Sequence, residues 1–372
     1  MKSILLSVFA IICLALFTLY DTGSDGYAGD NDGMTVTSGS IRLIFAGDVM
    51  GHSTQINGAW RDGGDSCYNF IPNFQWVKAY ISQADIAVAN LEVTFAGEPY
   101  TGYPAFSSPQ SLAVALQDAG FNLLVTANNH ILDRGVAGLQ RTVDVLESLD
   151  ISHTGSFMDA ESREKNHPLV IEKNGFKLAF LNYTYGTNMS RAKPPVTVNY
   201  MDTILIAADL EQAREMNADY IITCIHWGEE YQNQENRTQR EMAEFLARNG
   251  CDLIVGSHPH VVQPIKKIAV SEADSVLVAY SLGNFVSNQR WRYSDGGIML
   301  DVTLTRTGGI VSLDAYSYEP FWVYRYPEKG VQVYRLIPVI DYLSTPERYP
   351  AMSSEDEKKL IQFYNDTKRI IE

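Results

Sequence analysis

Two histidines lie two residues apart in the segment Val255-Gly256-Ser257-His258-Pro259-His260-Val261, directly after an apolar run. In an extended backbone, residues i and i+2 point to the same side, so both imidazoles would face one point. Pro259 fixes its own φ and disfavours the helical region for His258, which predicts a stiff, extended pair. Such a pair can bind a divalent metal ion. A short motif of this kind is also compatible with two ordinary loop histidines, and alone it leaves both interpretations open.

Ligand-type side chains also follow other short apolar runs. Asp48 follows residues 41–46, Glu92 follows 85–89, Asn129 and His130 follow 121–127, and His226 follows 220–225. Each has an ordinary alternative as a turn residue, a surface carboxylate or a core-edge histidine. Helical stretches separate the runs, which indicates parallel strands whose carboxyl ends meet at one edge of a sheet. The joint pattern therefore predicts a metal site.

Carboxylate, amide and imidazole donors together suit manganese, iron or zinc. The predicted ligands are Asp48, Glu92, Asn129, His226, His258 and His260. These six ligands are more than one tetrahedral zinc ion needs, so they predict a site for two metal ions. A hydroxide shared by two ions would attack a phosphoryl or acyl group. His130 is placed to protonate the leaving group, and Asp133 is close enough in sequence to orient its ring. We therefore expect His130 and Asp133 to be catalytic.

The spacing of apolar residues and the positions of turn residues predict the strands and helices that would position these side chains. Strands are predicted at 41–46, 85–89, 121–127, 220–225, 253–255 and 275–280, a hairpin at 169–181 around Asn174-Gly175, and antiparallel strands at 297–304 and 309–313. Helices are predicted at 70–82, 111–120, 135–146, 204–216, 239–249 and 353–371. The alternation predicts an α/β fold with a largely parallel inner region.

The net charge of the protein limits the classes of ligand that we expect it to bind. The 372 residues include 44 acidic and 29 basic side chains, for a net charge of −15. Nucleic-acid binding depends on Lys and Arg that neutralise phosphates, so we expect no nucleic-acid partner. An anionic substrate stays compatible with this charge if metal ions supply local positive charge.

The N-terminal segment has the sequence pattern of a membrane-targeting signal. Lys2 precedes an apolar run over 4–20, at the border between a signal peptide and a spanning helix. No clean small-x-small cleavage site follows, which favours an uncleaved anchor over secretion after cleavage. Lys2 predicts that the remainder lies outside the cytoplasm. We expect an anchor at 1–20, a Gly- and Asp-rich tether at 21–40, a domain at 41–345 and a C-terminal helix at 346–372.

Six motifs, in order, resemble the CapA family of poly-γ-glutamate capsule biosynthesis proteins, also called PgsA, which has a calcineurin-like metallophosphoesterase fold. They are Gly47-Asp48-Val49-Met50, Asn90-Leu91-Glu92, Asn128-Asn129-His130-x-x-Asp133-x-Gly135, His226-Trp227-Gly228-x-x-Tyr231, Gly256-Ser257-His258-Pro259-His260 and Ser281-Leu282-Gly283-Asn284-Phe285, and the segment from Asn182 to Asn188 is a seventh point of resemblance. The resemblance implies a four-layer α/β/β/α sandwich with a dinuclear site.

The resemblance also implies a role for each motif residue. Asp48 and His260 resemble ligands of one metal, and His226, His258 and Asn129 ligands of the other. His130 resembles the catalytic acid, and Glu92 stands where metallophosphoesterases have a bridging aspartate. Met50 stands where those enzymes have a histidine, and a thioether is a poor ligand for a hard ion. His52 is near, but its offset is unsuitable unless the loop bends.

The function implied is that of a membrane-anchored, extracytoplasmic capsule biosynthesis protein. It would assist synthesis, export or attachment of poly-γ-glutamate or a related anionic polymer, with a metal-dependent hydrolase-type site. Its expected partners are the membrane, other synthase subunits and the polymer. Two alternatives stay open. One is a non-catalytic metal-binding subunit of a synthase complex, which the missing Asp-x-His histidine favours. The other is a phosphoesterase that acts on an unrelated substrate.

Overall fold

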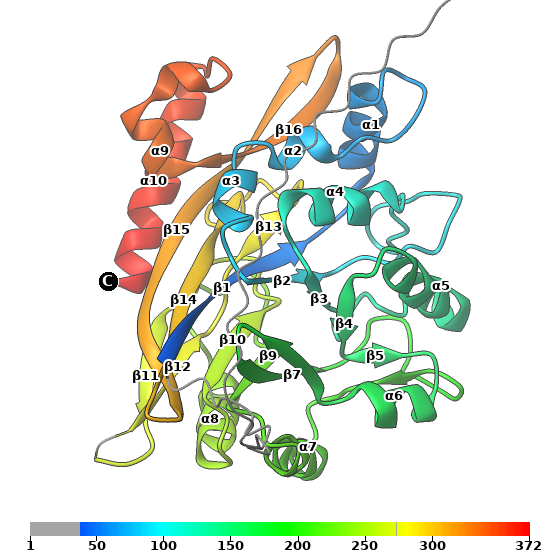
Figure 1. Cartoon of the computed structure of the whole chain (residues 1–372). Helices are drawn as coiled ribbons and strands as arrows, with labels where there is room; N and C mark the ends of the chain where they lie inside the picture. The colour runs from blue at the N-terminus through cyan, green and yellow to red at the C-terminus, as the bar shows by residue number, and fades with distance from the viewer. Residues whose placement is uncertain (1–37, 273) are drawn as a thin grey trace, which may run out of the picture. The chain divides into compact units, whose positions relative to one another are not determined.

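The computed structural model describes residues 38–272 and 274–372 (Figure 1). The predicted anchor at 1–20 and the predicted tether up to residue 37 lie outside the described residues, and residues 38–40 form the start of the first strand. In the described part of the chain, no helix is both long enough and apolar enough to cross a membrane.

The larger sheet has eight strands in the order β16-β15-β14-β1-β2-β3-β4, with β13 also paired to β1. Strands β1 to β4 run parallel, whereas β14, β15 and β16 are antiparallel additions. The bounds are β1 (Ser38–Val49), β2 (Ile86–Leu91), β3 (Leu123–Val125), β4 (Ser152–Thr154), β13 (Asn284–Val286), β14 (Gly296–Thr307), β15 (Ile310–Glu328) and β16 (Val331–Pro338).

The second sheet has six strands in the order β11-β12-β10-β9-β7-β6. They are β6 (Leu169–Lys173), β7 (Phe176–Thr184), β9 (Tyr220–His226), β10 (Leu253–Ser257), β11 (Ile265–Ala269) and β12 (Ser275–Ala279); β5 (Ser156–Phe157) and β8 (Thr197–Val198) form a separate pair. The four central strands are parallel, as predicted. Asn174 and Gly175, with φ of 54° and 79°, form the predicted hairpin turn between β6 and β7.

The two sheets pack face to face through one hydrophobic core. Alternate residues of β1, such as Leu43 and Phe45, meet side chains such as Phe180 and Ile222 from the smaller sheet. Helices cover the outer faces, with α4 and α5 on the larger sheet and α7 and α8 on the smaller one (Figure 1). This arrangement confirms the predicted α/β fold and its four-layer α/β/β/α order.

Five predicted helices are present as α4, α5, α7, α8 and α10, whereas α1, α6, α9 and η1 were not predicted. The bounds are α1 (Ser53–Asp62), α2 (Ile71–Phe74), α3 (Lys78–Ile81), α4 (Ser111–Ala119), α5 (Gly135–Ser148), α6 (Ala160–Asn166), α7 (Thr203–Glu215), α8 (Arg237–Arg248), α9 (Val339–Ser344), the 3-10 turn η1 (Pro346–Arg348) and α10 (Ser354–Ile371). The single helix predicted at 70–82 is wrong, because α2 and α3 are separate turns. Phe74, Val77 and Ile81 are buried at the predicted helical spacing, although the chain makes a turn between α2 and α3.

Candidate metal centre

The ends of strands β1, β2 and β13 bring polar side chains together. Asp48 of β1 lies in register with Asn90 of β2 and with Asn284 of β13. Asn90 Nδ2 donates a hydrogen bond to Asp48 Oδ1 at 2.8 Å. The approach of the chain to this point needs a glycine, because a Cβ on Gly47 would lie 1.9 Å from the Gly283 carbonyl oxygen. Asp48 is therefore held in a buried position at the edge of the sheet.

The smaller sheet supplies histidine to the same place. His226 ends β9 and pairs in register with Ser257, the last residue of β10. The Ser257 Oγ lies 3.0 Å from His226 Nδ1, and the Asn129 Oδ1 lies 3.0 Å from His226 Nε2. Asn182 of β7 accepts from the backbone N–H groups of residues 126 and 127 and so holds the segment that carries Asn129. The two sheets therefore meet at the candidate centre.

Two groups of donor atoms share Glu92. One contains Glu92, His226 and His258, and the other contains Asp48, Glu92 and His260. Within each group the donor atoms lie within 4.8 Å of one another, which is close enough to hold a metal ion. The Glu92 Oε1 lies 3.7 Å from His226 Nε2 and 3.8 Å from His260 Nε2. The division of the two histidines between two positions is compatible with this geometry, and their role as ligands stays a prediction.

Glu92 is the strongest indication that the donor set fits a cation. Its side chain is fully buried, and neither carboxylate oxygen has a hydrogen-bond partner among the described residues. Burial, and then the charge of Asp48, raises the pKa of Glu92 well above its usual value. A buried carboxylate without a partner is costly, and a divalent cation would offset that cost. The residues present therefore fit a metal centre.

The histidines are in the protonation state that ligands require. Burial lowers the pKa of His258 to about 3 and that of His226 well below its usual value, and neighbouring imidazoles add to both shifts. Both rings are therefore neutral at neutral pH, the form that binds metal. The His258 Nδ1 is buried and has no hydrogen-bond partner among the described residues. Such a nitrogen is available to an ion.

The extended conformation predicted for His258-Pro259-His260 is wrong. Strand β10 ends at Ser257, and His258 and His260 have φ values of 98° and 59°. Asp48 holds this turn, because the His258 N–H donates to its Oδ2 at 3.3 Å and His260 Nδ1 lies 2.9 Å from the same oxygen. The two rings reach one centre because contacts with Asp48 impose an unusual backbone, not because of strand period.

His130 and Asp133 form a close pair beside the donor groups. Asn128 connects this segment to β2, because its Nδ2 donates to the Leu91 carbonyl and its Oδ1 accepts from the His130 N–H. The His130 Nδ1 lies 2.7 Å from Asp133 Oδ2, which also accepts from the Phe106 N–H at 2.8 Å. The carboxylate thereby orients the ring, and Nε2 lies 3.5 Å from Asn188 Nδ2.

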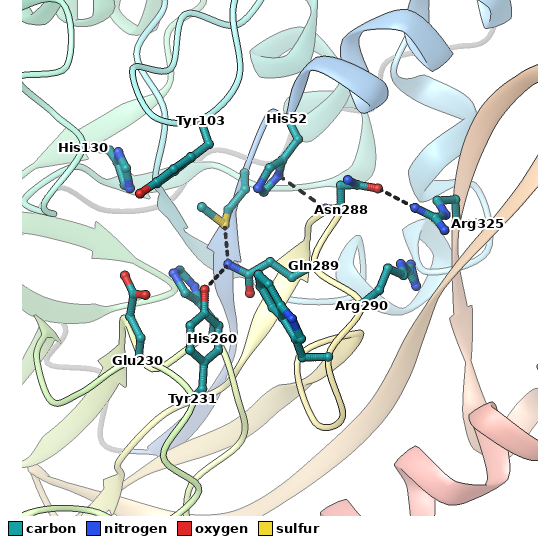
Figure 2. Close-up of a pocket in the computed structure, with 12 residues that line it drawn as sticks. His52, Tyr103, His130, Glu230, Tyr231, His260, Asn288, Gln289, Arg290 and Arg325 are labelled. Atoms are coloured by element: carbon teal, nitrogen blue, oxygen red, sulfur yellow. Dashed lines mark hydrogen bonds between the residues drawn. The ribbon is translucent and has the colours of Figure 1, made fainter.

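A cavity of about 640 Å³ opens beside these residues (Figure 2). His130, Glu230 and His260 lie on one side of it, and Arg290 and Arg325 lie on the other, with Gln289 between the two groups. This volume is in the range of ligand-binding pockets. A substrate in the cavity would therefore contact both the His130 side and the arginines.

Comparison with known proteins shows the family. The family model described as "Bacterial capsule synthesis protein PGA_cap" matches residues 42–289, more than half of the chain. The chain belongs to the PGA_cap family. The PGA biosynthesis protein CapA of Bacillus subtilis (strain 168) is 29% identical over 283 residues, which cover 74% of this chain and 70% of that relative. The capsule biosynthesis protein CapA of Bacillus anthracis is 28% identical over 253 residues, which cover 65% of this chain and 59% of that relative. These matches confirm the resemblance to CapA.

Solved structures are similar to this PGA_cap protein at low sequence identity. The calcineurin-like phosphoesterase YfkN from Bacillus subtilis is 12% identical, with a TM-score of 0.48 and coverage of 89% of this chain and 98% of that one. A phosphatase from Mycoplasma pneumoniae is 15% identical, with a TM-score of 0.42 and coverage of 82% and 97%.

Met50 is the position at which the resemblance implied a histidine ligand. Met50 is buried, and Gln289 Nε2 lies 3.9 Å from its sulfur. His52 is not in either Glu92 donor group, because it lies at the start of α1 and its Nδ1 is 3.0 Å from Gln55 Oε1. Burial lowers the pKa of His52 to about 4. His52 therefore does not replace the missing ligand.

Restoring the histidine is expected to strengthen metal binding. Met50→His adds an imidazole two residues after Asp48, on the wall of the cavity. We expect affinity for zinc or manganese to rise by at least the ~10-fold that an outer-shell partner contributes. Isothermal titration calorimetry measures the change, and Met50→Leu, which adds no donor, is the control. An unchanged affinity would show that this position does not face an ion.

Three residues in or beside the motifs had no predicted role. Glu230 forms a third donor group with His258 and His260. Asn90 contacts both Asp48 and His226, whose Nδ1 lies 3.2 Å from Asn90 Nδ2. The half-exposed Tyr185 ring lies 4.6 Å from the His258 ring. Asn90 and Glu230 lie within quoted motifs, so position in a motif was the available signal.

Proposed function

We propose that this capsule synthesis family member is a membrane-anchored, extracytoplasmic protein with a metal-dependent hydrolase-type site. It acts on poly-γ-glutamate or a related anionic polymer during synthesis, export or attachment. One observation carries the hydrolytic part: Glu92, which is buried and has no hydrogen-bond partner among the described residues, is shared by two donor groups beside a cavity. The polymer class is supported by the PGA biosynthesis protein among the relatives. The apolar run at 4–20 supports the anchor.

The candidate ligands for two divalent ions are Asp48, Glu92, Asn129, His226, His258 and His260. Bound ions would supply Lewis-acid activation of a substrate oxygen and of an attacking water. Manganese, iron and zinc all suit this set of oxygen and nitrogen donors. The neutral imidazoles of His226 and His258 and the buried carboxylates are already positioned, so binding requires little rearrangement of the chain.

His130 supplies the proton in this proposal. Its Nδ1–H donates to Asp133, which fixes the orientation of the ring. Asp133 is itself held by the Phe106 N–H. When water adds to the substrate carbonyl and the C–N bond breaks, the leaving nitrogen takes a proton from His130 Nε2, and the proton that the water gives up restores His130. Acyl transfer of this kind would shorten the polymer or release its end.

A second candidate is a non-catalytic, metal-binding subunit of a synthase complex. Met50 in the place of a ligand favours it, because one ion position then has fewer strong donors. In that case the ions would hold the polymer or the fold without turnover.

The test uses the full chain purified in mild detergent. Bound metal per chain is measured by mass spectrometry, and turnover is followed with γ-glutamyl polymer and with a phosphodiester. The proposal expects up to two ions per chain and metal-dependent shortening of the γ-glutamyl polymer. Bound metal with no turnover would support the non-catalytic subunit. Turnover of the phosphodiester alone would indicate a phosphoesterase with an unrelated substrate.

A further inference from the structure

The cavity beside the candidate metal centre has a cationic side. Arg290 follows β13, and Arg325 is on β15, so two separate segments bring the guanidinium groups to one cavity. Figure 2 shows both on the side away from His130 and Glu230. The chain has a net charge of −15, so two cations at one site need an explanation.

Neither arginine forms an ion pair with a carboxylate among the described residues. Both terminal nitrogens of Arg290 donate to the Val323 carbonyl oxygen, at 2.8 and 2.6 Å, and its buried Nε has no acceptor among those residues. Arg325 donates to the side-chain oxygen of Asn288 at 3.0 Å. Asp295 interacts with Arg290 through its charge, and its Oδ2 accepts a hydrogen bond from Trp322 Nε1 at 2.7 Å. The positive charges are therefore left for a ligand.

The segment that carries this cationic side is held in place. The Asn288 side-chain oxygen accepts from Tyr334 at 2.6 Å as well as from Arg325, and the Asn288 N–H donates to His52 Nδ1 at 3.3 Å. Gln289 Nε2 donates to the Tyr231 hydroxyl at 3.3 Å. Groups fixed in this way bind an anion without a large loss of side-chain freedom.

Exposed aromatic rings border the same cavity. Tyr103, Tyr231 and Trp291 are 72%, 40% and 61% exposed, and the Tyr231 and Trp291 rings lie 5.0 Å apart. Such surfaces suit the methylene and amide groups of a chain, while guanidinium forks match carboxylate geometry. A ligand with regularly spaced carboxylates on an amide backbone would satisfy both features.

We propose that Arg290 and Arg325 form a subsite for a carboxylate of the polymer, beside the unit that lies at the donor groups. The subsite sets the preference of the cavity for a polyanion and positions the chain for the reaction. This inference rests on the proposed function for its choice of a carboxylate polymer. A phosphate group has similar chemistry, and the test separates the two.

The test measures binding of a fluorescent γ-glutamyl oligomer by anisotropy to the full chain, in the presence of a chelator. Arg325→Gln and Arg290→Gln are each expected to weaken binding by about tenfold or more, because charge-assisted hydrogen bonds are lost. Lysine variants keep the charge, so they should lose less affinity and keep the salt dependence, which the glutamine variants reduce. The control Arg248→Gln removes an equally charged side chain from α8, outside the cavity, and should bind normally.

Wild-type affinity in folded Arg290→Gln and Arg325→Gln would overturn the proposal. The proposal would also be overturned if the two arginines were needed for binding of inorganic phosphate and the oligomer did not bind. If Arg290→Gln fails to fold, Arg325→Gln decides, since it loses a contact with a side chain and not with the backbone. If the wild type binds the oligomer in a way that depends on the two arginines but does not cleave it when metal is present, the subsite is supported and the hydrolytic function is not.

Discussion

Glu92→Gln is expected to remove most of the bound metal and to abolish metal-dependent turnover. Glu92 is the residue that both donor groups share, so its carboxylate affects both ion positions. The loss in metal affinity should exceed the ~10–100-fold that follows removal of an outer-shell partner. Metal content by mass spectrometry and affinity by calorimetry check this result. Unchanged affinity would show that the candidate centre is wrongly placed.

In the metal-free protein, Glu92→Gln is not expected to lower stability. Glutamine has the shape of glutamate without its charge, so in chelator Glu92→Gln should be at least as stable as the wild type. With metal added, the order should reverse, because only the wild type gains binding free energy. Glu235→Gln is the matched control: it removes another buried glutamate, paired to Lys266 at 2.6 Å, and should lower stability without changing metal content.

His130→Ala is expected to reduce turnover by ~10²–10⁴-fold while metal content stays constant, because the variant loses the proton donor and keeps the ligands. Asp133→Asn should also be slow, since an amide does not hold the imidazole in the same tautomer. His153→Ala, on β4 and away from the cavity, should have normal activity. Full turnover by His130→Ala with both ions bound would exclude this residue as the acid.

Much of the scaffold could be predicted from residue pattern. Apolar runs and glycine stops identify most strands and helices because local period and burial agree in them. Gly120, with φ of 114°, ends α4 as expected. Asp48 and Glu92 lie close together because the parallel strands β1 and β2 end together, whereas His226 comes from the other sheet and reaches them only because the two sheets pack together.

The remainder depends on contacts between distant segments. The φ of His258 is imposed by Asp48, 210 residues away, so no local rule reports it. Phe74, Val77 and Ile81 are buried at the spacing of one helix, so the apolar period does not report the break between α2 and α3. Arg290 and Arg325 belong to no recognised motif, and they become a pair only when β13 and β15 lie in one sheet.

The shared position of Asp48 and His260 has a further consequence for how the chain folds. They are 212 residues apart in sequence: Asp48 is in β1 of the larger sheet, and His260 follows β10 of the smaller sheet. An ion held by both would act as a cross-link that closes a very long loop. Closing a longer loop removes more entropy from the unfolded ensemble, so such a clip has a large effect on stability. Metal loading would then couple the two sheets into a single cooperative unit, and the protein would mature as it acquires its ions.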